Sequence, residues 1–199
     1  MKNKSSNNLE LINTSIFNSM NLLDLILNDK DLLNKISEIA DYIYDALSKE
    51  NKIIFAGNGG SAADAQHLAA EFIVRYRHNR KSLPSISLSA DTSIITAIGN
   101  DFGYEKIFSR QLEGLVRSGD IFLAMTTSGN SMNILEALAF CKENNIFSIV
   151  LTGDNKNLEK KSDIILNIPS KETARIQEAH ILIGHIICEI VENKVYLPN

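Results

Sequence analysis

The chain has 199 residues, of which 44% are hydrophobic, so it is long enough for one domain with a substantial core and a helical extension. Its formal net charge of -4 and its pI of about 5.6 exclude a broad basic surface, and we therefore expect no nucleic-acid partner. The polar N-terminus, the lack of a long apolar stretch and two cysteines without a CxxC spacing favour a cytoplasmic protein with reduced thiols and no membrane partner.

Apolar residues between positions 9 and 50 recur at helical spacing in two blocks. The polar run 28–31 separates the blocks and offers an N-cap for the second helix. We therefore expect two N-terminal helices, and we interpret residues 1–50 as a helical segment that mediates oligomerisation. A simple covering layer for the domain is the alternative.

The rest of the chain, residues 51–199, alternates short apolar runs with helical patterns. Strands are expected at 52–55, 84–88, 120–126, 147–152 and 163–168. Helices are expected at 62–76, 91–100, 108–116, 131–144, 155–161 and 173–193. This order predicts an α/β fold in which helices cover both faces of a five-stranded parallel sheet, a three-layer sandwich of the flavodoxin-like type.

A glycine-rich turn follows the first expected strand and has the sequence Gly57-Asn58-Gly59-Gly60-Ser61-Ala62. It matches the G-x-G-x-x-A dinucleotide fingerprint, but residues 75–81, where that fingerprint needs an acidic residue, are rich in Arg and Lys, and no Walker lysine follows. Glycines allow a ligand to approach the backbone, and amides at a helix N-terminus attract phosphate. We therefore predict a site for phosphate or another polar ligand, with Ser61 capping the helix. A plain strand-to-helix turn is the alternative.

A second polar loop follows the buried strand at 120–126 and carries the hydroxyl groups of Thr126, Thr127, Ser128 and Ser131. Ligands of open α/β sheets bind at the carboxyl ends of the strands, where hydroxyls and backbone amides can surround phosphate oxygens. A serine- and threonine-rich turn with a cap at Ser131 is the alternative. The presence of two such loops in one chain favours a small phosphorylated ligand.

Two expected helices carry the residues best suited to proton or metal chemistry. His67 and Glu71 are four residues apart among small and apolar residues, so they share one helix face. On the last helix, Gln177 and His185 lie about 80° apart around the axis and roughly 12 Å apart along it. Because they barely reach a common point, we predict that one of them reaches a site in a neighbouring subunit and that a monomer is inactive. An irregular first turn around Gln177 is the alternative.

Two further features have more than one interpretation. Asp101, after a glycine-asparagine turn, is expected near the same sheet edge, where it holds substrate hydroxyls or tunes His185; a turn-capping aspartate is the alternative. The basic residues between positions 75 and 81 are interpreted as a solvated face, although Arg75 lies one turn beyond Glu71 and is able to face the mouth of a site.

Four motifs occur in order along the chain: residues 57–67, Gly99-Asn100-Asp101-Phe102-Gly103, Thr127-Ser128-Gly129-Asn130-Ser131 and Arg175-Ile176-Gln177-Glu178. Together they resemble the bacterial phosphoheptose isomerases, which are sugar isomerase (SIS) domain proteins that act on sedoheptulose 7-phosphate. The resemblance covers nearly the whole chain. It implies a five-stranded parallel sheet, an N-terminal helical segment, a homotetramer with active sites between subunits, and one zinc ion per subunit.

The resemblance also implies roles for individual residues. It implies that zinc is held by His67, Glu71, Gln177 and His185. It implies that the substrate is contacted by Asn58, Gly59, Gly60, Ser61, Glu71, Asn100, Asp101, Thr126, Thr127, Ser128, Ser131 and Gln177. The implied catalysts are Glu71 and His185, together with Asp101. Two departures are visible: Ala174 stands where some members have Asp, and Thr126 stands where Ser is common.

The implied reaction converts sedoheptulose 7-phosphate to D-glycero-D-manno-heptose 7-phosphate through a cis-enediol, with Glu71 as base, His185 as acid and zinc as Lewis acid. This would be the first step of nucleotide-activated heptose synthesis for lipopolysaccharide or capsule. A nonenzymatic relative that binds the bacterial replication initiator lacks the helix glutamate and the final histidine, whereas this chain keeps both. The alternatives are a non-catalytic SIS-domain regulator that binds sugar phosphates and an isomerase for another phosphosugar.

Overall fold

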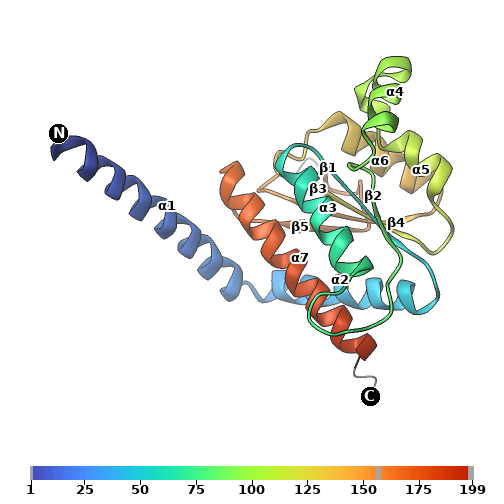
Figure 1. The fold of residues 1–199 in the computed structure, drawn as a ribbon, viewed down its shortest axis with the longest axis horizontal. Coiled ribbons are helices and arrows are strands. Elements are labelled where there is room, and N and C mark those ends of the chain that lie inside the picture. The colour runs from blue at the N-terminus through green and yellow to red at the C-terminus, as the bar shows by residue number, and fades with distance from the viewer. Residues whose placement is uncertain (1, 156–157, 197–199) are drawn as a thin grey trace.

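The computed structural model describes residues 2–155 and 158–196 and begins with the two helices expected from the sequence (Figure 1). These helices, α1 (Lys2–Asn28) and α2 (Lys30–Ser48), meet at Asp29, whose carboxylate accepts a hydrogen bond from the backbone N–H of Leu32 at 3.0 Å. The bond satisfies one of the free N–H groups at the start of α2, and it confirms the N-cap predicted in the run 28–31. α2 packs onto the domain, whereas α1 projects away from it.

The sheet contains five parallel strands, which are β1 (Ile53–Gly57), β2 (Ser85–Ser87), β3 (Ile121–Thr126), β4 (Phe147–Thr152) and β5 (Ile164–Asn167). Their number and parallel direction agree with the prediction, and their order, β2-β1-β3-β4-β5, is that of flavodoxin-like sheets. The chain leaves β1 toward one edge of the sheet and returns to β3 on the other side. The carboxyl ends of β1 and β3 therefore form the topological switch point, where ligands of such sheets bind.

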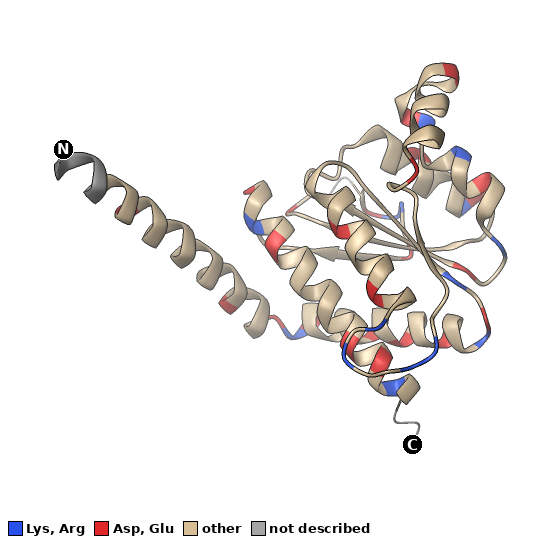
Figure 2. Ribbon diagram, viewed as in Figure 1, with Lys and Arg blue, Asp and Glu red and all other residues tan. Residues whose placement is uncertain are grey.

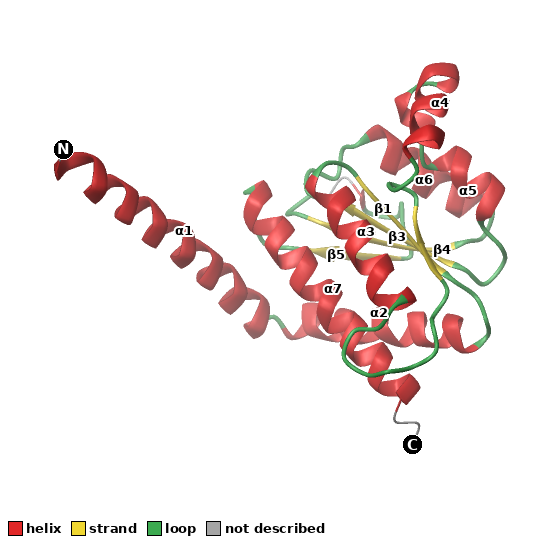
Figure 3. Ribbon diagram, viewed as in Figure 1, coloured by secondary structure: helices red, strands yellow, loops and turns green. Residues whose placement is uncertain are grey.

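Helices cover both faces of the sheet, which confirms the three-layer sandwich (Figure 3). They are α3 (Gly60–Ile73), α4 (Thr92–Phe102), α5 (Ser109–Leu115), α6 (Met132–Glu143) and α7 (Thr173–Tyr196), with a short 3-10 helix η1 (Tyr104–Lys106). Neighbouring residues of β1 point into different layers. Phe55 is buried with residues of α2, α3 and α7, and Ile54 is buried with residues of α5 and α6.

α3 ends at Ile73, earlier than the limit of 76 that the sequence pattern predicted. The reason is a side chain from further along the chain, because the Arg80 guanidinium donates hydrogen bonds to the backbone carbonyls of Glu71 at 2.9 Å and Phe72 at 2.8 Å. The last carbonyls of a helix have no helical partner, and the arginine satisfies two of them.

α4 continues to Phe102, so the Gly99-Asn100 pair that the sequence indicated as a turn belongs to the last turn of this helix. The helix ends at Gly103, whose φ of 92° lies in the region that favours glycine. The short helix expected at 155–161 includes residues 156–157, which lie outside the described residues.

Charged residues are spread over the domain but are sparse on the coloured part of α1 (Figure 2). Between residues 7 and 28 only Glu10 and Asp24 carry a charge. Among the helices described here, none combines the length and the apolar character needed to cross a bilayer. Between residues 7 and 28, α1 therefore carries mainly apolar, amide and hydroxyl side chains.

Candidate functional site

α3 and α7 lie side by side and run in the same direction, so that their residues pair in step. A Cβ atom on Gly60 would come within 2.7 Å of the Gln177 amide, and one on Gly184 would come within 2.6 Å of the Leu68 methyl groups. Both glycines therefore allow a close approach that a larger residue would prevent. This alignment brings the middle of α3 to the middle of α7.

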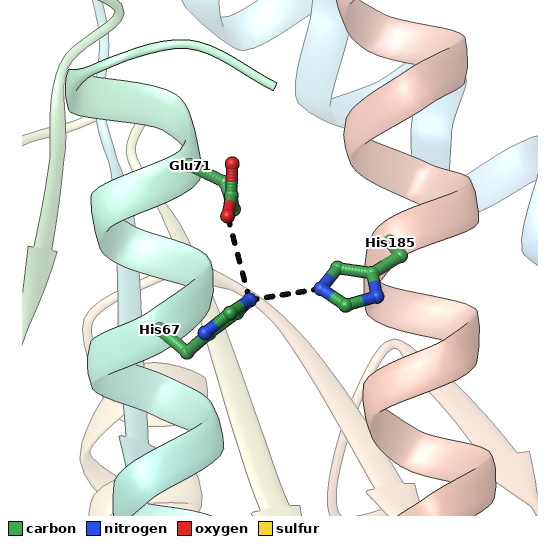
Figure 4. Close-up of side chains that lie close together, drawn as sticks. All are labelled: His67, Glu71 and His185. Carbon is green, nitrogen blue, oxygen red and sulfur yellow. Dashed lines mark hydrogen bonds and ion pairs between the residues drawn. The ribbon is translucent and has the colours of Figure 1, made fainter. Parts of the chain in front are cut away.

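Three side chains meet between the two helices, and we call them the His-Glu-His cluster: His67, Glu71 and His185 (Figure 4). The Nε2 atoms of the two histidines are 2.8 Å apart, and Nε2 of His67 lies 3.4 Å from Oε1 of Glu71. Their ligand atoms all lie within 4.8 Å of one another. The side chains of His67 and Glu71 are 49% and 22% exposed, so the cluster is open to a small molecule.

The donor set of the His-Glu-His cluster fits a zinc ion. Two neutral imidazole nitrogens and one carboxylate form the three-ligand set of catalytic zinc sites, which keep a further position open for water or substrate. Among the described residues, this is the one group of three or more His, Cys, Asp or Glu side chains close enough to share an ion.

Gln177, the fourth residue of the implied metal set, lies near the N-terminal ends of α3 and α7. Its side-chain amide packs against Gly60, and the 1.5 Å rise per residue puts Gly60 about 10 Å from His67 along α3. The structure therefore brings together His67, Glu71 and His185 in one chain but leaves Gln177 apart. The prediction that Gln177 or His185 reaches a site in a neighbouring subunit stays a prediction. Because His185 meets His67 in the same chain, Gln177 is the residue to which it applies.

The first glycine loop differs in one detail from its prediction, because Ser61 does not cap the helix. α3 begins at Gly60, the N-cap is Gly59 with a φ of 55°, and no side chain caps the helix start. The Ser61 side chain is buried inside the first turn. The left-handed backbone of Gly59 starts the helix earlier than a serine cap would.

Asn58 connects the same loop to α6, the helix that follows β3. Its side-chain amide exchanges two hydrogen bonds with the buried amide of Asn133 on α6, at 2.9 and 2.8 Å. The Tyr104 hydroxyl also donates to Asn58 Oδ1 at 3.1 Å. Sequence reasoning missed Asn133 and Tyr104, since no local pattern links positions so far apart in the chain.

The second polar loop lies next to the first, because Gly57 and Met125 are paired at the ends of β1 and β3. Thr126 Oγ1 lies 3.3 Å from Ser131 Oγ and accepts a hydrogen bond from the Gly129 backbone at 3.3 Å. Ser131 is the N-cap of α6 by position, yet its side chain makes no capping bond. The hydroxyls of Thr126 and Ser131 are thus held close together at the loop, with Thr126 buried. Thr127 and Ser128 belong to the same loop.

Asn100 and Asp101 do not join the cluster within this chain. They lie at the exposed end of α4, where the Asn100 amide donates to Asp101 Oδ1 at 2.8 Å. Figure 1 shows α4 standing well apart from α7. A role for Asp101 in tuning His185 of the same chain is therefore not supported by the geometry.

The interpretation of the basic run 75–81 as a solvated face is wrong for Arg80. Its side chain is only 5% exposed and forms an ion pair with Glu192, which is 1% exposed, at 3.0 Å. The sequence contained one signal for this pair. Glu192 lies seven residues after His185 and therefore on the same face of the last helix.

With the geometry in place, comparison with known proteins first defines the class. A family model described as the SIS domain matches residues 20–153. The fold agrees with that of a phosphoheptose isomerase from Francisella tularensis with a TM-score of 0.89 at 35% identity, covering 94% of this chain and 98% of that one. A phosphoheptose isomerase from Neisseria gonorrhoeae gives a TM-score of 0.84 at 36% identity, covering 93% and 98%.

Sequence similarity then narrows the class. The chain is 49% identical over 188 residues to a phosphoheptose isomerase of Aneurinibacillus thermoaerophilus, which covers 94% of this chain and 95% of the relative. A second relative, from Campylobacter jejuni, is 50% identical over 172 residues and covers 86% of each chain. The chain belongs to the phosphoheptose isomerase family of SIS-domain proteins, which confirms the resemblance drawn from the four motifs.

Proposed function

We propose that this chain, an aldose-ketose isomerase by family, converts sedoheptulose 7-phosphate to D-glycero-D-manno-heptose 7-phosphate. The observation that carries the proposal is the convergence of His67, Glu71 and His185 on two helices beside the glycine-rich loop and the hydroxyl-rich loop of the sheet edge. An imidazole and a carboxylate are the groups that proton transfer between two neighbouring carbons requires. The reaction would be the first step of nucleotide-activated heptose synthesis for lipopolysaccharide or capsule, in a cytoplasm that keeps Cys141 and Cys188 reduced.

The substrate phosphate binds at the sheet edge in this proposal. Backbone amides at Gly59 and Gly60 and the hydroxyls of the second loop supply donors for its oxygens. The separation of about 10 Å between Gly60 and His67 along α3 suits the carbon chain of an extended sugar phosphate. The phosphate therefore occupies the loops while C1 and C2 reach Glu71. Asn58 belongs to the same loop as Gly59 and Gly60 and completes the substrate contacts within this chain, with Ser61 buried behind it.

Glu71 removes a proton from C1 of the open-chain ketose, and the electron pair forms the C1–C2 double bond of a cis-enediolate. His185 donates a proton to O2 and accepts one from O1. Glu71 then returns its proton to C2, so the aldose forms with no net change in atoms. A zinc ion held by His67, Glu71 and His185 would supply Lewis-acid stabilisation of the negative charge on the substrate oxygens, and Glu71 and His185 would transfer protons only while released from that ion.

We also propose that the enzyme works as a homotetramer in which residues 1–50 drive assembly and residues 51–199 form the SIS domain. α1 exposes an apolar stripe spaced by three and four residues, the pattern of helices that pack together: Leu9, Ile12, Ile16, Met20, Leu23 and Leu27. A second stripe, at Leu22 and Ile26, is already buried in the same chain. Sites shared between subunits would bring Asn100, Asp101 and Gln177 of one copy to the cluster of another.

The direct test is to incubate the purified, zinc-loaded protein with sedoheptulose 7-phosphate in D₂O and to follow aldose formation by NMR. We expect the manno-heptose product with solvent deuterium at C2, because the enediolate is protonated from a group that exchanges with water. Binding without any aldose would indicate a regulatory module instead. Turnover of a shorter ketose phosphate in preference to the heptulose would indicate an isomerase with another substrate.

A further inference from the structure

One face of α7 continues from the His-Glu-His cluster into a second set of polar residues. His185, Glu189 and Glu192 are spaced by four and three residues, so they form one stripe along the helix. The segment 74–84, which joins α3 to β2, contacts each of the three residues of this stripe. A single loop is therefore fixed to the helix that carries His185.

Glu192 anchors this loop. Its buried carboxylate accepts hydrogen bonds from the backbone N–H groups of Tyr76 at 2.8 Å, Arg77 at 2.5 Å and His78 at 2.9 Å, and from Nε of Arg80 at 3.0 Å. Burial by itself raises the pKa of Glu192, but the three backbone amides and the Arg80 charge outweigh it and hold the pKa below its ordinary value. The carboxylate therefore stays ionised and paired at neutral pH.

Arg80 connects Glu192 to α3. While its Nε binds the Glu192 carboxylate, its Nη2 donates to the backbone carbonyl of Glu71 and its Nη1 to that of Phe72. The guanidinium thus joins the last turns of both helices that supply the cluster. One of the two carbonyls belongs to Glu71, the proposed base.

Tyr76 extends the same loop onto the cluster. Its ring packs against the His185 imidazole with centroids 5.6 Å apart, and His67 packs against the same imidazole at 5.0 Å. The Arg77 guanidinium lies over the Tyr76 ring at 5.4 Å and forms an ion pair with Glu189 at 2.5 Å. The His185 ring is therefore held between neighbours in an orientation that directs Nε2 to His67.

We propose that Arg80, Glu192 and Tyr76 are positioning residues that form a brace for the His-Glu-His cluster. The Arg80–Glu192 pair sets the separation of α3 and α7, and Tyr76 sets the orientation of the His185 ring. The brace touches neither substrate nor metal, so it acts through His185 and Glu71. Its expected effect on turnover rests on the proposed function, but its effect on the geometry of the cluster does not.

The first test removes the pair without leaving a buried charge. The double variant Arg80→Met/Glu192→Leu replaces two paired ions by apolar side chains of similar size, a change that often preserves folding. Its zinc affinity, measured by competition with a chromogenic chelator, is expected to fall by about 10- to 100-fold, as for other losses of support around metal ligands. The matched control is Arg110→Met/Glu113→Leu, which removes an exposed Arg–Glu pair on α5.

The second test addresses Tyr76 in the metal-free protein. Tyr76→Leu removes the ring, so we expect the His185 ring resonances to shift in ¹H–¹⁵N NMR spectra and zinc affinity to fall by about tenfold. Tyr76→Phe keeps the ring and should retain both the resonances and the affinity, apart from small local shifts. A merely structural role for the loop would not separate these two variants.

The outcomes distinguish the brace from the proposed function. Unchanged His185 resonances and unchanged zinc affinity in Tyr76→Leu and in the folded double variant would overturn the brace, even if the parent chain isomerises the heptulose phosphate. The variants could show the expected losses of zinc affinity and shifts of the His185 resonances while the parent chain does not isomerise the heptulose phosphate. That result would support the brace and contradict the proposed reaction. If the double variant fails to fold, the two Tyr76 variants still decide.

Discussion

Two long helices at opposite ends of the chain, α7 and α1, differ in how much of their surface the chain itself uses. α7 buries residues from Ile176 to Glu192 and shares its polar face with α3 and the loop after it. α1 is held to α7 mainly near its middle, where Arg175 donates to the Ser15 carbonyl at 2.6 Å and Ser19 donates to Glu178 at 2.8 Å. Leu22 and Ile26 are buried near its end, whereas the stripe from Leu9 to Leu27 stays exposed.

The contrast indicates which parts of the site one chain can build alone. The His-Glu-His cluster is complete between α3 and α7, because both helices belong to the same packed layer. Within the part of the chain that the structure describes, the stripe of α1 and the exposed end of α4 have no such neighbour. Large exposed apolar surfaces usually mark contacts with another protein. Changes on the α7 side should therefore alter chemistry, and changes on α1 should alter assembly.

The largest effect is expected from Glu71→Gln, which changes the His-Glu-His cluster and leaves α1 unchanged. The amide cannot accept the C1 proton, so kcat should fall by about 10³-fold, or roughly 4 kcal/mol, while sugar-phosphate binding largely survives. Stopped-time aldose assays and calorimetric titration with the substrate measure the two quantities. Glu113→Gln, on an exposed face of α5, is the matched control. Normal turnover by Glu71→Gln would move the role of base to another residue.

The next effect concerns α1. Ile16→Glu/Met20→Glu places two charges on its exposed stripe and should convert the assembly to smaller species in light scattering, because buried like charges in a helix seam are unfavourable. Activity should fall with assembly if the sites are shared. Asn18→Glu/Asn21→Glu adds the same charges off the stripe and should change neither. A monomer with full activity would contradict shared sites.

The two regions also differ in how far the sequence alone predicts them. The central strands β1, β3 and β4 follow from apolar runs, because parallel strands are buried on both faces, and the run 147–152 coincides with β4. β2 is shorter than the expected range 84–88 and is only partly buried, with two serines around Ile86. The separation of Gln177 and His185 also followed from helix geometry, which is local. The meeting of His67 with His185 did not, because it depends on α3 lying beside α7; only the family resemblance indicated it.

Long-range pairing explains the remaining differences. Arg80 finds its partner Glu192 more than a hundred residues later, so its sequence neighbours give it the appearance of a surface residue. Ser61 was expected as a cap because serine is common there, but the backbone conformation of Gly59 decided where the helix began. Sequence patterns thus predict the elements, and contacts between distant elements decide what each polar residue does.

A third prediction concerns His180, in the buried part of α7. The ring is fully buried, and within the described residues neither ring nitrogen makes a hydrogen bond of good geometry. Burial lowers its pKa from 6.5 to about 4, an effect that the nearby Thr152 backbone only partly offsets. The unfolded chain therefore takes up a proton at a higher pH than the folded chain does.

It follows that folding stability falls as the pH drops from about 6.5 to about 4, by roughly 3 kcal/mol in total and by about 2 kcal/mol at pH 5. Urea unfolding near pH 7 and near pH 5 measures the loss. His180→Leu, which cannot be protonated, should lose less between these two values. An equal loss in both proteins would mean that other groups dominate the acid response.

The smallest effect is expected from Gly184→Ala, which tests how closely α7 must approach α3. The new Cβ would lie 2.6 Å from both methyl groups of Leu68, so Leu68 must move and the protein should lose about 1–2 kcal/mol in urea unfolding. Gly114→Ala is the matched control, because nothing lies near that position in α5, and it should be neutral or slightly stabilising. Leu68 adjoins His67 in the sequence. If the free energy of zinc binding falls by more than the free energy of unfolding does, the cluster depends on the spacing of the two helices. An unchanged zinc affinity would mean that the spacing of the helices at Gly184 does not control the cluster. Support for the cluster would then come from the brace near the C-terminal ends of α3 and α7.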